Sequence, residues 1–108
     1  MGKNDTRKDS DGGVDIMDRT SEKLKHPAMF VVFVHNDPYT PREFVVEVLM
    51  RFFQKTKEQA VKIMIVAHTK GMGAAGVYTK EIAETKAAAA NAHCRAEGRP
   101  LTFSIQEE

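Results

Sequence analysis

Apolar positions are concentrated after residue 26, and they follow two different periods. Residues 29–34 form a continuous apolar run of β-branched and aromatic side chains, bounded by Pro27 and by the turn-forming residues 36–38. Such a run between turn residues predicts a buried strand. In the next segment the apolar side chains recur at helical spacing instead: Phe44, Val45, Val48, Leu49 and Phe52. This change of period predicts a strand followed by an amphipathic helix.

Two segments have the pattern of a helix N-terminus. Residues 40–43 place a threonine at a predicted N-cap, a proline at the first helical position and a glutamate at the position that closes a capping box. Residues 56–59 repeat the capping-box pattern, and Gly71 is the predicted end of that second helix. One face of the second helix collects its apolar residues and a histidine: Ala60, Val61, Met64, Ile65 and His68.

The remaining residues predict a strand, a helix and a last strand. Residues 73–78 are typical of a short strand that contains glycine, and a threonine-capped, alanine-rich helix is predicted from residue 79 to about residue 97. Gly98 and Pro100 end this helix, and residues 101–105 alternate as a strand does. The element order is β-α-α-β-α-β. This predicts an α+β domain in which three helices cover a small three-stranded antiparallel sheet.

Residues 1–26 differ from the rest of the chain. Twelve of the 26 are charged, six of each sign, and the few sizeable apolar residues show no sustained period. Such a segment buries too little surface to offset the entropy of ordering. We therefore expect a flexible N-terminal arm over residues 1–26 and one core domain over residues 27–108. Composition alone does not distinguish an arm that has a function from a tail that has none.

Charge and composition exclude several classes of protein. The net charge of +1 makes nucleic acid a poor candidate partner, because no large positive field is available to hold phosphates. The single cysteine, Cys94, permits no intrachain disulfide and favours a reducing compartment. No signal peptide is evident, and the longest apolar runs, residues 29–34 and 63–67, are too short to span a bilayer. We expect a cytoplasmic protein without membrane contact, and nothing in the sequence requires more than a monomer.

Three polar residues could form a binding site. Asn36 and Asp37 follow the first predicted strand, and His68 lies at the edge of the apolar face of the second helix. An amide oxygen, a carboxylate and a neutral imidazole all accept hydrogen bonds, which suits an ammonium group such as a peptide α-amino group. Two ordinary alternatives remain open at this point. Asn36 and Asp37 are common turn residues, and His68 could be a core histidine satisfied internally.

Other chemistry finds less support in the sequence. Asp37 and His68 could form a catalytic dyad, but serine and cysteine nucleophiles are scarce near them in the predicted fold. His93 and Cys94 are adjacent on a helix and point in different directions, and no third metal ligand is evident. The competing class of protein is a plain docking domain, similar in shape to the C-terminal domain of the ribosomal stalk protein, with no pocket for a chain terminus.

Several motifs resemble one known family. Residues 34–45, Val-His-Asn-Asp-Pro-Tyr-Thr-Pro-Arg-Glu-Phe-Val, are similar to the signature of the ClpS adaptors. The run from residue 59 through His68 to Gly71, the segments 76–79 and 83–86, and the ending 98–101 also fit. The similarity covers residues 29–106 in the same order. It implies a non-catalytic adaptor that takes substrates whose first residue is Leu, Phe, Tyr or Trp and delivers them to a ClpA-type AAA+ unfoldase for degradation by ClpP.

The resemblance also implies a role for individual positions, with no cofactor and no metal. Asn36, Asp37 and His68 would hold the α-amino group, and Glu81 and Lys86 would contact the N-terminal domain of the unfoldase. The N-terminal arm falls where the family has an extension that the unfoldase engages. The wall of the hydrophobic pocket would consist of Val34, Thr40, Arg42, Val45, Met64, Ala67 and Leu101.

Three positions depart from the usual pattern of the family. Arg42 stands where a methionine that screens β-branched first residues is common. Ala67 is small where a larger apolar residue is usual, which would enlarge the cavity. Pro38 replaces a frequent aspartate and removes a negative charge near the ammonium.

Overall fold

The computed structural model describes residues 27–108, so the predicted arm over residues 1–26 lies outside the described residues. Three helices and three strands follow one another in the predicted order β-α-α-β-α-β. Their bounds are β1 Met29–His35, α2 Arg42–Phe53, α3 Lys57–Lys70, β2 Met72–Thr79, α4 Lys80–Ala96 and β3 Thr102–Glu107. The predicted fold class is confirmed.

The three strands form one antiparallel sheet in the order β2-β1-β3, so the most apolar strand is central. Val32 and Val34 point to the covered face of the sheet and are fully buried, as the alternation of a strand requires. The register between β1 and β2 shifts between Val32 and Phe33, because Val32 pairs with Gly76 and Phe33 with Ala74. Ala75 is thus the extra residue of a β-bulge on β2.

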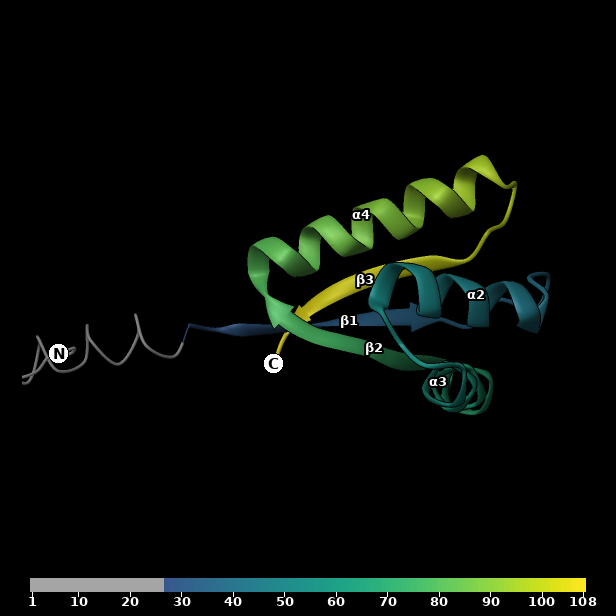
Figure 1. The fold of residues 1–108 in the computed structure, drawn as a ribbon, viewed down its shortest axis with the longest axis horizontal. Coiled ribbons are helices and arrows are strands. Elements are labelled where there is room, and N and C mark those ends of the chain that lie inside the picture. Colours follow the sequence, from purple (N-terminus) through teal and green to yellow (C-terminus); the bar gives the residue numbers. More distant parts are fainter. Residues whose placement is uncertain (1–26) are drawn as a thin grey trace, which may run out of the picture.

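Figure 1 shows α4 lying along one face of the sheet, while α2 and α3 gather at the end where β1 finishes. The core forms between the sheet and the helices. Alanines on α4 let it lie close to the strands, and larger side chains from α2 fill the centre. The buried residues shared by these elements include Val32, Val34, Val48, Leu49, Phe53, Ala83, Ala87, Ala90, Cys94 and Phe103.

The predicted capping box of α2 is wrong. The helix begins at Arg42 with Pro41 as its N-cap, and no side chain caps it. The hydroxyl of Thr40 donates a hydrogen bond to the carboxylate of Asp37 instead. A threonine hydroxyl can form a hydrogen bond either with a helix N-terminus or within a nearby turn. Here it bonds within the turn that follows β1.

The other predicted helix boundaries are confirmed in position. The Thr56 hydroxyl accepts from the Gln59 backbone N–H at 3.1 Å, and the Gln59 side chain accepts from the Thr56 N–H at 3.0 Å, which completes the capping box of α3. Gly71 ends α3 with a φ of +96°, a conformation that favours glycine. Thr79 is the N-cap of α4, although its side chain makes no capping hydrogen bond.

Gly73 allows α3 to approach the sheet closely. A Cβ atom at this position would lie 2.8 Å from the carbonyl oxygen of Ile63 and 3.3 Å from the backbone nitrogen of Ala67. The first distance is shorter than real contacts allow, and the contact is with backbone, which cannot simply rotate away. The missing side chain therefore fixes the position of α3 on β2, and with it the position of the residues at the C-terminal end of α3.

Among residues 27–108, no helix is both long and apolar enough to cross a membrane.

Candidate functional site at the end of the central strand

A cavity of about 310 Å³ opens where β1 ends. Its walls come from the end of β1, the loop that follows, the first turns of α2, the C-terminal half of α3 and the residue before β3. Such a volume lies at the lower end of the range typical of small-ligand pockets. The residues that line the cavity are Val34, His35, Asn36, Asp37, Pro38, Thr40, Pro41, Arg42, Val45, Met64, Ala67, His68 and Leu101.

The fold brings together all ten residues that were assigned to the two parts of the predicted pocket. The three for the amino group and the seven for the hydrophobic wall lie around one cavity. Three further residues also line it: His35, Pro38 and Pro41. Their signal in the sequence was contiguity, since each is adjacent to a predicted site residue.

The cavity has an apolar interior and a polar mouth. Val34 is fully buried, and Val45, Ala67 and Leu101 are also buried. Asn36 and His68, in contrast, are exposed, and Asp37 is half-buried. A ligand that fits this arrangement has an apolar group to place inside and a polar, hydrogen-bond-donating group to leave at the solvent boundary.

Asp37 is held in place by its own loop. Its carboxylate accepts the hydrogen bond from the buried hydroxyl of Thr40, and its carbonyl oxygen accepts from the Thr40 backbone N–H at 3.4 Å. The turn-forming role that the sequence left open for Asp37 is therefore present. It does not use up the carboxylate, because two carboxylate oxygens offer about four acceptor positions.

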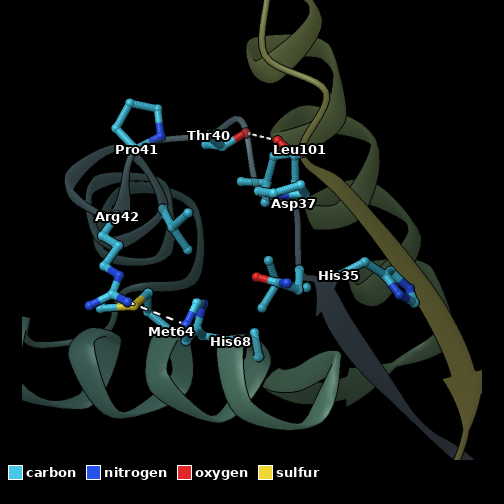
Figure 2. Close-up of a pocket in the computed structure, with 13 residues that line it drawn as sticks. His35, Asp37, Thr40, Pro41, Arg42, Met64, His68 and Leu101 are labelled. Carbon is cyan, nitrogen blue, oxygen red and sulfur yellow. Dashed lines mark hydrogen bonds between the residues drawn. The ribbon is translucent and has the colours of Figure 1, made fainter.

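His68 is not a core histidine. It is exposed in the last turn of α3, and its Nε2 atom lies 3.3 Å from an Nη2 atom of Arg42, the first residue of α2. Figure 2 shows the arginine side chain reaching from α2 to the imidazole on α3, beside Met64. The alternative interpretation of His68 as a satisfied core residue is wrong.

Asn36 is positioned by a backbone hydrogen bond to α3. Its N–H donates to the carbonyl oxygen of Gly71 at 2.8 Å, which joins the end of β1 to the end of α3. The partial negative charge of a helix C-terminus then lies close to the cavity mouth. This field favours a cationic ligand group at that place, in addition to the acceptors on the side chains.

His35 belongs to the lining but directs its ring elsewhere. Its Nε2 atom lies 2.6 Å from the Ser104 hydroxyl on β3, and in Figure 2 the ring points away from the centre of the cavity. We assign His35 to the attachment of β3 rather than to ligand contact.

Glu81 and Lys86, assigned to an unfoldase contact, both lie on α4 and outside the cavity lining. Glu81 is exposed. Lys86 is half-buried and donates to the carbonyl oxygen of Phe52 at 3.3 Å and to the side-chain oxygen of Gln54 at 2.5 Å. Its ammonium group also lies 5.3 Å from the centre of the Tyr78 ring. Lys86 therefore caps the C-terminal end of α2, as cations do at that end of a helix.

Burial perturbs two titratable groups outside the cavity lining. It raises the pKa of the Cys94 thiol, with the nearby Arg95 acting in the opposite direction, and it raises the pKa of the Tyr78 hydroxyl. A raised pKa makes Cys94 a poor nucleophile, because the thiolate is the reactive form. In the part of the chain that the structure describes, no three His, Cys, Asp or Glu side chains are grouped so as to hold a metal ion.

The cavity lining also offers no serine or cysteine beside His68. A helix-covered sheet with a ligand-sized cavity and acceptors at its mouth defines a small binding domain.

Comparisons with known proteins agree with this class. The family model described as ATP-dependent Clp protease adaptor protein ClpS matches residues 25–104. The chain is 54% identical over 86 residues to the ATP-dependent Clp protease adapter protein ClpS of Oleidesulfovibrio alaskensis, which covers 80% of this chain and 83% of the relative. It is 45% identical over 97 residues to the protein of the same name from Nitratidesulfovibrio vulgaris strain Miyazaki F, over 90% of this chain and 97% of the relative.

A solved structure supports the same assignment. Agrobacterium tumefaciens ClpS2 bound to L-phenylalaninamide superimposes with a TM-score of 0.74 at 37% identity, over 77% of this chain and 100% of that one. The chain belongs to the ClpS family, whose members are adaptor proteins of the Clp protease and not enzymes.

Proposed function

We propose that this chain binds the first residue of substrate proteins, with a free α-amino group and a Leu, Phe, Tyr or Trp side chain, and delivers them to a ClpA-type unfoldase for degradation by ClpP. The observation that carries the proposal is the division of the cavity into a buried apolar interior and an exposed mouth of hydrogen-bond acceptors. An N-terminal residue with a bulky apolar side chain matches both parts, because its ammonium group donates hydrogen bonds to the mouth and its side chain fills the interior.

The α-amino group is the part that the mouth selects. A peptide ammonium has three N–H donors and a positive charge, and Asn36, Asp37 and His68 supply an amide oxygen, a carboxylate and an imidazole nitrogen. Hydrogen bonds that involve a charged group contribute roughly 1.5–3 kcal/mol each when both partners remain satisfied. An acetylated terminus lacks the charge and would leave Asp37 partly desolvated without a cation.

The side chain is the part that the interior selects. Burial of a Leu or Phe side chain contributes roughly 1.5–3 kcal/mol, and the wall formed by Val34, Val45, Ala67 and Leu101 has no charge to desolvate. Together with the amino-group contacts this suffices for about micromolar affinity after ordering costs. The ligand of the A. tumefaciens relative is consistent with the proposal, since L-phenylalaninamide carries a free amino group, an aromatic side chain and an amide in place of a peptide bond.

Delivery would use a different surface from the cavity. We assign unfoldase contact to α4, with Glu81 presented directly to the partner and Lys86 acting from its position at the end of α2. Residues 1–26 are assigned to engagement by the unfoldase during delivery.

The test is a fluorescence anisotropy titration with labelled peptides that differ only in the first residue: Leu, Phe, Tyr, Trp, Ile, Val and Ala, plus acetylated Leu. We expect binding of the four bulky residues and loss of binding on acetylation. Asp37→Asn should weaken binding of the Leu peptide at least tenfold, about 1.4 kcal/mol. Glu43→Gln, which removes an exposed carboxylate of α2 outside the cavity lining, serves as the matched control and should bind as the wild type does.

Equal affinity for free and acetylated termini would contradict the proposal. In that case the chain would be a docking domain that binds folded partners and ignores chain termini, and Asp37→Asn would have no more effect than Glu43→Gln.

A further inference from the structure

The guanidinium of Arg42 contacts His68 Nε2, an acceptor that the ammonium group of the proposed ligand would use. A guanidinium group has donors and no acceptor, so its contact with His68 Nε2 at 3.3 Å is a hydrogen bond only in the tautomer whose Nε2 carries no proton. In that tautomer the imidazole proton is on Nδ1. A ligand ammonium that approaches His68 thus meets a nitrogen already engaged by a cation of the same chain, and it must displace the guanidinium to use it.

The placement of Arg42 is electrostatically unusual. It is the first residue of α2, where the helix dipole disfavours a positive charge. Its side chain reaches from there to His68 in the last turn of α3, where the dipole favours one. Figure 2 shows this side chain running from α2 toward Met64 and the imidazole of His68. The guanidinium is therefore held at the mouth by the contact that ligand binding would break.

The charges of the lining leave Arg42 without a counter-charge once the site is filled. Among the lining residues, Asp37 and Arg42 carry the opposite formal charges, and His35 and His68 are the other titratable side chains. When a ligand ammonium pairs with Asp37, no second carboxylate in the lining remains for Arg42. A carboxylate on the ligand beside the mouth would supply that counter-charge.

We infer that Arg42 selects the second residue of the substrate, favouring Asp or Glu and disfavouring Lys or Arg there. This inference rests on the proposed binding of a first residue. The Cα atoms of consecutive residues are 3.8 Å apart, so the second residue lies just outside the mouth when the amino group lies at Asn36, Asp37 and His68. A flexible arginine displaced from His68 stays within reach of that position.

The test compares peptides with Leu first and Glu, Gln or Lys second, titrated with the wild type and with Arg42→Gln and Arg42→Glu. An exposed ion pair is worth up to about 1 kcal/mol, so the wild type should prefer Glu over Gln by roughly two- to fivefold and disfavour Lys by a similar factor. Added salt should shrink both ratios. Arg42→Gln should bring the affinity ratios close to one, and Arg42→Glu should reverse the preference so that Lys is favoured over Glu.

Arg51→Gln is the matched control, because it removes an exposed arginine from the opposite end of the same helix. It should retain the wild-type ratios. Long-range ¹H–¹⁵N NMR spectra of the free protein add a readout that affinity does not supply: the wild type should carry the His68 proton on Nδ1, and Arg42→Gln should shift the tautomer population toward Nε2–H.

Two results would overturn the inference while leaving the proposed function intact. One is first-residue selectivity with equal affinity for Glu, Gln and Lys at the second position. The other is a wild-type His68 with its proton on Nε2, unchanged by Arg42→Gln. Failure to bind any free terminus would overturn the proposed function, and the inference with it.

Discussion

The backbone N–H of Asn36 donates a 2.8 Å hydrogen bond to the carbonyl oxygen of Gly71, and this bond joins the two segments that form the mouth of the cavity. One segment carries Asn36 and Asp37 after β1, and the other carries His68 in the last turn of α3. Gly71 can present its carbonyl there because it adopts a φ of +96°. The geometry of the site therefore depends on the backbone of a residue that does not line the cavity.

Gly71→Ala tests this dependence. No atom lies within 4 Å of a Cβ built at Gly71, so the effect comes from the positive φ, which raises the energy of an L-residue by about 1–2 kcal/mol. We expect a fall of that size in the free energy of unfolding measured in urea. We also expect at least a threefold loss of affinity for a Leu-first peptide, because the strained turn shifts the carbonyl that positions Asn36.

Gly98→Ala is the matched control for this prediction. Gly98 has a φ of +70°, also has open space for a Cβ, and lies after α4, outside the cavity lining. It should lose similar stability and bind the peptide normally. If both variants bind equally well, the Asn36–Gly71 hydrogen bond does not control the site.

Thr40→Val removes the hydroxyl that orients the Asp37 carboxylate while keeping the shape of a buried side chain. We expect peptide affinity to fall about three- to tenfold, since one hydrogen bond to a charged group is lost and the carboxylate can rotate away from the mouth. Thr40→Ser keeps the hydroxyl and should stay close to the wild type. Unchanged affinity in Thr40→Val would show that Asp37 needs no orientation by Thr40.

Ala67→Val narrows the cavity from the α3 side. The two added methyl groups should lower affinity for Trp-first and Phe-first peptides more than for a Leu-first peptide, by roughly tenfold for Trp, because larger side chains need the space that Ala67 leaves. Ala60→Val overpacks the core on the same helix without reaching the cavity lining. It should lower stability and preserve the ranking of first residues, and an identical ranking in Ala67→Val would contradict a limiting role for Ala67.

Lys86 and Glu81 should differ in their effects on stability. Lys86→Met keeps the aliphatic stem but loses the hydrogen bonds to Phe52 and Gln54, so the free energy of unfolding should fall by about 1 kcal/mol or more. Glu81→Gln alters an exposed side chain and should leave stability unchanged while weakening unfoldase binding in a pull-down or titration. A fully stable Lys86→Met would show that the Lys86 contacts do not support the end of α2.

Stability should decline at alkaline pH. Burial raises the pKa of Cys94 and of Tyr78, so the folded protein keeps protons that the unfolded chain releases, from about pH 8.5 for a thiol and about pH 10 for a tyrosine. Where the unfolded state binds fewer protons, the free energy of unfolding falls as pH rises. Urea titrations between pH 7 and 10.5 should show this fall, with a smaller slope near pH 9 in Cys94→Ala. If Cys94→Ala showed the same slope as the wild type, the Cys94 thiol would not contribute to the loss of stability at alkaline pH.

Local sequence patterns were sufficient for most of the secondary structure. The apolar run of β1, the capping box of Thr56 and Gln59 and the glycine at position 71 each specify a structure through neighbouring residues alone, and each is confirmed. The N-terminus of α2 shows where local reasoning fails. Thr40 has two possible partners, the helix and the Asp37 carboxylate, and the choice depends on how the loop folds over the cavity.

The composition of the site was also predictable, because the motif residues identify which side chains take part. Their arrangement was not, since Asn36 and His68 are distant in the chain and only the sheet, the Gly73 contact with α3 and the Asn36–Gly71 hydrogen bond place them together. The same holds for exposure: the pattern around His68 allowed a core histidine, and the packing of α3 leaves it at the surface.

The sequence by itself determined the order of elements, the buried strand over residues 29–34 and the residue types around the cavity, because these follow from short-range periodicity and from motifs. Tertiary structure decided which of those residues meet. It places the Lys86 ammonium at the C-terminal end of α2, pairs the Thr40 hydroxyl with the Asp37 carboxylate and brings the Arg42 guanidinium to the His68 imidazole. The Lys86 and Arg42 contacts depend on the distance between elements far apart in the chain, and no local pattern encodes that distance. The Thr40 hydroxyl has two nearby partners, and the fold of its loop decides between them.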